Sequence, residues 1–146
     1  MDFLLSEDRE SFDSKALSGL KVTTLSPGRC VCSFFVTEGH TNRYGTLHGG
    51  CTATLADVVS TVALTTSTEL SGVSVNLAVT YLSPMPGGQE VIVDAQVVKI
   101  GKSLATINVT FSRKSDGAAV AVATHTKFIQ AATGSKAATG FVRSKL

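Results

Sequence analysis

Apolar and polar residues alternate with a period of two along most of the chain, a pattern that predicts β-strands. Between residues 49 and 66 the pattern changes, because Ala53, Ala56, Val59 and Ala63 recur at helical spacing. This change predicts one long, largely buried helix, and residues 7–18 are expected to form a short one. The predicted strands are Lys21–Leu25, Arg29–Thr37, Val73–Tyr81, Val91–Ile100, Leu104–Arg113 and Ala119–Ile129.

Turn signals separate the four late strands and make them antiparallel neighbours. Residues 83–88 read Ser-Pro-Met-Pro-Gly-Gly, Gly101-Lys102 suits a two-residue hairpin, and Ser115-Asp116-Gly117 forms another break. We therefore expect an α+β fold in which a curved antiparallel sheet of five to six strands wraps one apolar helix. A single domain is expected over residues 1–130.

Residues 131–146 lack periodicity and are rich in Ala, Thr, Gly, Ser and Lys, so a flexible tail is expected. The sequence ends in Ser144-Lys145-Leu146, the tripeptide that the peroxisomal import receptor recognises at a free C-terminus. We expect a peroxisomal protein, and otherwise a cytoplasmic one.

The composition of the chain argues against some classes of function. The 146 residues are 43% hydrophobic but only 16% charged, so we expect that another copy of the chain covers part of the surface. A net charge of +2 and 6% aromatic residues do not favour nucleic-acid binding. Asp57 interrupts the weakly charged run 44–68, which argues against a membrane span. Three cysteines without a leading signal peptide suggest an intracellular setting, and Cys30 and Cys32 are expected on one strand face.

Charge is unevenly distributed along the chain. From Lys99 onward there are eight basic residues and one acidic residue, Asp116. Two interpretations stay open: a solvated surface with a basic tail, or an edge of the later strands that faces phosphate groups.

Two features of the long helix could carry chemistry. Asp57 is a lone carboxylate on a largely apolar helix, and burial of such a group requires compensation. His48-Gly49-Gly50 opens the same helix, where free N–H groups and the helix dipole stabilise a developing oxyanion. The structural alternatives are an inert Asp57 at a surface or dimer seam, a His48 that only caps, and glycines that only allow close packing.

Helix geometry separates these two features. Asp57 follows His48 by nine residues, which places the two side chains on opposite faces of a helix. Asp57 also lies about 12 Å along the axis from Gly49. If the two groups act on one substrate, a second subunit must supply Asp57, most simply across a two-fold axis.

Three runs of sequence, HTNRYGTLHGGCTATLAD, GVSVNLAVTYLSP and KIGKSLA, resemble those of the hot-dog-fold acyl-CoA thioesterases. The resemblance covers roughly residues 18–129 and is strongest to the thioesterase-superfamily-member and PaaI-like subgroup. It implies a hot-dog fold whose dimers pair into tetramers. It also implies hydrolysis of acyl-CoA in lipid metabolism, with coenzyme A as part of the substrate and no metal or redox cofactor.

The resemblance implies a role for each of five residues. The Gly49 N–H would polarise the thioester carbonyl, with His48 beside it. Asp57 of the partner subunit would act as general base, Asn42 would place the water or the substrate, and Ser74 would position the nucleophile.

The same resemblance suggests less specific contacts with CoA. Asn76, Tyr81, Ser83 and Pro84 would line the pantetheine and nucleotide path. The hairpin that contains Lys99, Gly101, Lys102 and Ser103 would also contact CoA, with Lys99 and Lys102 meeting the phosphates. The alternative is that these lysines are solvated at the strand ends. Tyr44 would shape the acyl entrance, and His125, Thr126 and Lys127 match a family motif that could equally be structural.

Two other functions are possible for a hot-dog protein. A dehydratase or hydratase needs a histidine paired with a carboxylate, and the spacing allows His48 to meet Asp57 only across subunits. A non-catalytic acyl-CoA sensor needs the pocket but not the acid, so Asp57 is the residue that discriminates it from an enzyme.

Overall fold

The computed structural model describes residues 11–129. The predicted polar tail, with its Ser-Lys-Leu ending, and the first residues of the predicted short helix lie outside this range, so these expectations stay predictions. The helices are α2 (Phe12–Ala16), the 3-10 turn η1 (Glu38–His40) and α3 (Gly49–Thr65). The strands are β1 (Lys21–Ser26), β2 (Arg29–Phe35), β3 (Val73–Tyr81), β4 (Glu90–Ile100), β5 (Leu104–Arg113) and β6 (Ala119–Phe128).

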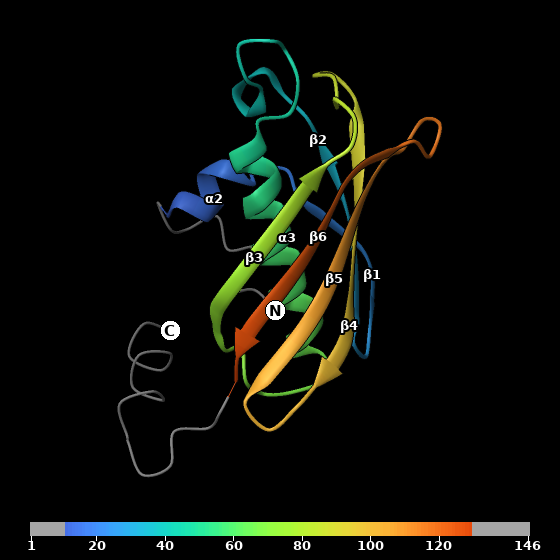
Figure 1. The fold of residues 1–146 in the computed structure, drawn as a ribbon. Coiled ribbons are helices and arrows are strands. Elements are labelled where there is room, and N and C mark those ends of the chain that lie inside the picture. Colours follow the sequence, from blue (N-terminus) through green and yellow to red (C-terminus); the bar gives the residue numbers. More distant parts are fainter. Residues whose placement is uncertain (1–10, 130–146) are drawn as a thin grey trace.

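The six strands form one sheet in the order β1-β2-β4-β5-β6-β3, and all neighbours are antiparallel. The strand that follows the long helix, β3, therefore lies at the edge of the sheet and pairs only with the last strand, β6. Figure 1 shows the sheet curving around α3, as the sequence pattern predicted.

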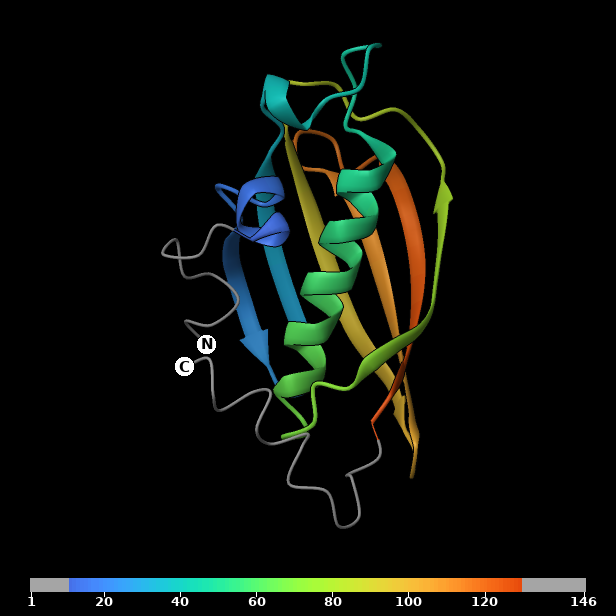
Figure 2. The same ribbon diagram turned by 90° about the vertical axis from the view of Figure 1, so that its left-hand side faces the viewer.

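The core lies between α3 and the inner face of the sheet. Figure 2 shows α3 running along this face, with β1 and β2 on one side and β3 on the other. Leu55, Val59 and Leu64 of α3 are fully buried against inward-facing strand residues such as Phe34 and Phe111. Cys30 and Cys32 are also buried, on the strand face that alternation predicted.

Local interactions define both ends of α3. His48 is the N-cap: its Nδ1 atom accepts a hydrogen bond of 2.9 Å from the Gly50 N–H. At the other end, the Thr66 hydroxyl accepts a bond of 2.7 Å from the Gly28 N–H in the β1–β2 turn. The helix is therefore anchored to the sheet beyond its last turn, which gives a rigid element on which functional groups can be spaced.

Strand β3 departs from strict alternation of its apolar and polar residues. Strict alternation would place Ser74 on the same face as Asn76, but the register with β6 shifts between these two residues. Such a β-bulge puts two residues of one strand opposite one of the other and redirects the side chains. As a result Ser74 reaches the buried His125, while Val73 and Val75 are 65% and 60% exposed.

Within residues 11–129, no helix is both long enough and apolar enough to cross a membrane.

Candidate active site

A cavity of about 550 Å³ opens at the start of α3. Its walls come from the loop before the helix, the first helical turn, the end of β3 and the segment that follows it. Five residues predicted to act on the substrate lie together there, namely Asn42, Gly49, Tyr81, Ser83 and Pro84. The fold thus brings the beginning of the helix and the strand after the helix to one site.

Gly49 gives this cavity a hydrogen-bond donor. As the first residue of the helix it lies where backbone N–H groups lack a partner within the helix. Tyr81 lies against it, and the Tyr81 hydroxyl donates a bond of 2.8 Å to the Gly49 carbonyl oxygen. A Cβ atom at position 49 would lie 3.1 Å from that hydroxyl, so the glycine allows Tyr81 to pack this closely against the start of the helix.

The Asn42 side chain organises the loop beside the cavity. Its Oδ1 atom accepts bonds from the N–H groups of Tyr44 (2.9 Å) and Thr46 (3.3 Å), and its Nδ2 atom donates to the Thr46 hydroxyl (3.0 Å). The carboxamide is therefore held in place, with one of its two Nδ2 hydrogens left for a ligand. Tyr44, expected at the acyl entrance, is 76% exposed on the same loop.

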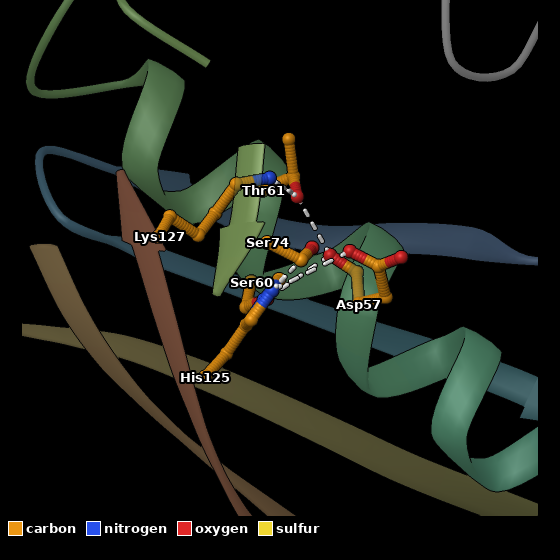
Figure 3. A network of polar contacts seen from close by, with 6 residues as sticks. All are labelled: Asp57, Ser60, Thr61, Ser74, His125 and Lys127. Atoms are coloured by element: carbon orange, nitrogen blue, oxygen red, sulfur yellow. Dashed lines mark hydrogen bonds and ion pairs between the residues drawn. The ribbon is translucent and has the colours of Figure 1, made fainter. Parts of the chain in front are cut away.

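Asp57 lies further along α3, in a separate polar cluster shown in Figure 3. The helix does not bury this residue, because 48% of the side chain is exposed in the single chain. Its neighbour in the cluster, His125 of β6, is fully buried, and the Nε2 atom of His125 lies 3.7 Å from Asp57 Oδ1. The carboxylate therefore lies at the boundary between a polar interior and solvent.

Hydrogen bonds define how His125 is oriented. Its Nδ1 atom lies 2.6 Å from the Ser60 hydroxyl and its Nε2 atom 2.8 Å from the Ser74 hydroxyl. The Ser60 hydroxyl donates its proton to the Asp57 carbonyl oxygen at 3.0 Å. A hydroxyl has one proton, so when Ser60 donates to this carbonyl it accepts from His125. In that arrangement neutral His125 carries its proton on Nδ1. The Ser74 hydroxyl then donates to Nε2.

Lys127 enters the same cluster from β6. It is only 4% exposed, and its ammonium donates a bond of 2.6 Å to the Thr61 hydroxyl. Thr61 in turn donates to the Asp57 carbonyl oxygen at 2.8 Å. The two buried side chains of β6 are thus linked through two α3 hydroxyls to one carbonyl group.

Burial and charge shift the two basic groups in the same direction. Burial lowers the pKa of His125, the Lys127 charge lowers it further, and the Asp57 carboxylate acts in the opposite sense. Burial also lowers the pKa of Lys127, again opposed by Asp57. The environment therefore favours a neutral His125.

Other predicted site residues lie apart from both groups. Lys99 lies near the end of β4, and Gly101, Lys102 and Ser103 lie in the β4–β5 turn, at the end of the sheet opposite the start of α3 (Figure 1). Asn76 is exposed on β3. His48 is exposed and caps the helix rather than lining the cavity. Asp57 and Ser74 are also absent from the cavity wall, so one chain does not assemble all the predicted residues.

Comparison with known protein families identifies the superfamily to which the chain belongs. The family model described as "Thioesterase superfamily" matches residues 44–120, more than half of the 146 residues. This segment contains the start of α3, Asp57, Ser74 and the cavity-lining residues of β3. The chain belongs to the thioesterase superfamily. The resemblance and the enzyme class that the sequence motifs implied are confirmed.

Individual members of the superfamily extend this result to most of the chain. Human acyl-coenzyme A thioesterase 13 is 41% identical over 116 residues, which are 79% of this chain and 83% of the human protein. The crystal structure of zebrafish thioesterase superfamily member 2 is also 41% identical. It superposes with a TM-score of 0.81, covering 84% of this chain and 89% of that one.

A bacterial structure, the PaaI protein of E. coli, is 25% identical, with a TM-score of 0.72 and coverages of 79% and 86%. These neighbours confirm the predicted hot-dog fold.

Ser60 and Thr61 were missed as site residues. Their positions three and four residues after Asp57 are a signal that sequence could have supplied, because such hydroxyls bond back to the carbonyl one turn earlier. Their pairing with His125 and Lys127 depends on how β6 lies against α3, which sequence spacing does not reveal.

Proposed function

We propose that this protein is an acyl-CoA thioesterase, which hydrolyses a fatty or aryl acyl-CoA to free CoA and a carboxylic acid. Membership of the thioesterase superfamily and the 41% identity to human acyl-coenzyme A thioesterase 13 support this substrate class. The observation that carries the proposal is the Gly49 N–H at the start of a 17-residue helix, facing a cavity large enough for a thioester and part of its chains.

The start of α3 stabilises negative charge on the carbonyl oxygen. When water attacks the thioester carbon, that oxygen becomes an oxyanion, and the Gly49 N–H and the positive end of the helix dipole stabilise it. The remaining Nδ2 hydrogen of Asn42 gives a second donor on the same cavity wall. Both donors are held before the substrate arrives, so little reorganisation is needed during the reaction.

Asp57 of a second subunit acts as the general base. It takes a proton from water as the water oxygen bonds to the carbonyl carbon; the carbon–sulfur bond then breaks, and the proton passes to the CoA thiolate. Ser74 accepts the other hydrogen bond of this water. The partner is required because Asp57 and Ser74 lie outside the cavity wall of their own chain.

The exposed edge strand supports a two-fold dimer. β3 pairs with β6 on one side only, and Val73, Val75 and Tyr81 on it are each more than half exposed. Pairing two such edges antiparallel would cover apolar surface and bring two α3 helices side by side in opposite directions. In such a dimer the Lys99 and Lys102 turn of one subunit would approach the partner's cavity and bind CoA phosphates. Association of dimers into a tetramer is part of the same proposal.

Release of free thiol from a panel of acyl-CoA substrates tests the function. The panel runs from short to long aliphatic chains and includes aryl-CoA. We expect hydrolysis by the wild type and a loss of kcat of about 1,000-fold in Asp57→Asn, because a positioned general base contributes about 10²- to 10⁴-fold. Asp94→Asn is the matched control, since Asp94 pairs with Arg29 on the outer surface.

Two outcomes would contradict the proposal. Saturable acyl-CoA binding without hydrolysis by the wild type would identify a sensor instead. Equal losses of kcat in Asp57→Asn and Asp94→Asn would show that Asp57 is not the general base.

A further inference from the structure

Lys127 is a buried cation to which the proposed hydrolysis assigns no role. Removing an ammonium group from water is unfavourable, and within residues 11–129 its single hydrogen-bond partner is the Thr61 hydroxyl. By contrast, Lys114 is exposed and pairs with Glu90 at the surface. A methionine would fill the Lys127 site without this desolvation. The charge therefore calls for an explanation other than stability.

Lys127 and His125 act on one carbonyl group through parallel hydrogen-bond chains. The Lys127 ammonium donates to Thr61, the His125 Nδ1–H donates to Ser60, and both hydroxyls donate to the Asp57 carbonyl oxygen. Figure 3 shows both side chains extending from β6 toward the same turn of α3. Two positive charges in one buried cluster repel each other, so a charged Lys127 opposes protonation of His125.

The protonation state of His125 decides what Ser74 offers to water. When His125 is neutral, the Ser74 hydroxyl donates to Nε2, and its oxygen lone pairs are directed to an incoming water beside Asp57. When His125 is an imidazolium, Nε2–H donates to Ser74 and attracts the Asp57 carboxylate 3.7 Å away. That ion pair would draw the base away from water.

We propose that Lys127 is a positioning residue for thioester hydrolysis, whose buried charge keeps His125 neutral and so directs the Ser74 hydroxyl toward Nε2. This inference rests on the proposed function, since it assigns Asp57 and Ser74 to the activation of water. Lys127 touches neither water nor substrate and acts through Thr61 and His125.

The charged groups that face Lys127 are few. Asp57 comes from α3 and His125 from β6 itself. The residues paired with Lys127 on the neighbouring strands, Ser74 of β3 and Ala105 of β5, carry no ionisable group in the physiological range. Among residues 11–129, the pH response of the cluster therefore depends on the carboxylate, the imidazole and the ammonium.

Lys127→Met is the main test, because it removes the charge but keeps an unbranched chain of similar length. We expect an unchanged or higher free energy of unfolding together with a loss of kcat of about 10- to 100-fold and little change in KM. The acidic limb of the kcat–pH profile should move to higher pH, because the pKa of His125 rises when the Lys127 charge is removed. Lys114→Met, the matched control, should stay within about two-fold of the wild type in kcat.

Substitutions of Thr61 test the connecting hydroxyl. Thr61→Ser retains the hydroxyl and should keep most of the wild-type kcat, whereas Thr61→Val removes it at nearly constant volume and should lower kcat. Equal activity in the two variants would contradict the role given to Thr61.

A titration of ¹⁵N-labelled histidines by NMR gives a readout that does not depend on activity. We expect His125 to be the Nδ1-protonated tautomer in the wild type and to titrate at higher pH in Lys127→Met. An unchanged His125 titration in Lys127→Met, with hydrolysis still dependent on Asp57, would overturn this inference and leave the proposed function intact. A shifted titration in a protein that hydrolyses no acyl-CoA would overturn the proposed function instead.

Discussion

In the proposed reaction, the start and the middle of α3 have different chemical roles and use different groups. At the start, the cavity is lined by neutral side chains and by backbone groups such as the Gly49 N–H. In the middle, a carboxylate, an imidazole and an ammonium are joined by hydroxyl groups. Stabilising an oxyanion requires donors in a given place, whereas activating water requires a given protonation state.

The two regions also differ in how far their side chains are buried. Gly49 and Tyr81 need access to substrate, and Tyr81 is 57% exposed. His125 and Lys127 are almost fully buried, because neighbouring charges influence one another more strongly away from water. Asp57, with 48% of its side chain exposed, and the exposed Ser74 lie on the solvent side of this cluster. The proposed dimer would place the partner's substrate there. In the proposed reaction, the positions of the hydrogen-bond donors therefore matter most at the start of α3. In the middle of α3, the charges that set the protonation state of His125 matter most.

Gly49→Pro removes the backbone N–H at the start of α3. Of the predictions in this Discussion, we expect it to have the largest effect on kcat. Proline is well tolerated at the first position of a helix but lacks the N–H. Removing one donor of an oxyanion site lowers kcat by about 100- to 1,000-fold, and we expect a loss in that range by thiol release.

Gly49→Ala is the control for this substitution. It adds a Cβ atom 3.1 Å from the Tyr81 hydroxyl but retains the N–H. We expect less than about a 10-fold loss, since only the Tyr81 side chain must shift. Similar losses in the two variants would show that shape, and not the donor, matters at the helix start.

Mixing Gly49→Pro with Asp57→Asn subunits tests whether the two regions meet across a dimer. Random pairing makes half of the dimers mixed, and each mixed dimer has one intact site out of two, so about one quarter of wild-type activity should return. Mixing must follow a denaturation and refolding step that exchanges subunits. No recovery, in a sample shown by mass spectrometry to contain mixed dimers, would place both groups in the same subunit.

Acid should lower the free energy of unfolding, because His125, which lies against the middle of α3, resists protonation in the folded protein. Burial is the main cause that lowers the pKa of His125, so between its folded and unfolded pKa values the unfolded chain binds the proton more readily. The free energy of unfolding should therefore fall as the pH drops below about 6.5, the ordinary value for histidine.

Urea unfolding at pH 7.5 and pH 5.5 measures this effect. The decrease between the two pH values should be smaller in His125→Gln than in the wild type. Burial also lowers the pKa of His40, but that contribution is common to both proteins. An identical decrease in both would mean that His125 does not titrate differently on folding.

Sequence periodicity predicted most of the fold. The alternation in Arg29–Thr37 and the helical spacing after Gly49 predicted elements whose ends agree with the structure to within two residues. These signals are local, since each comes from the need of one element to bury one face. The β3 bulge escaped prediction because it depends on the pairing of Ser74 and Asn76 with β6 and not on the residues of β3 alone.

The candidate site divides in the same way. The residues themselves determined that His48-Gly49-Gly50 begins a helix and that Asp57 lies on it, on the face opposite His48 and about 12 Å along the axis from Gly49. Only the tertiary structure decided that Tyr81 lies against Gly49 and that His125 and Lys127 reach the turn after Asp57. The reason is physical: helix geometry relates residues close in sequence, whereas contacts between residues more than 30 positions apart depend on how the sheet curves around the helix.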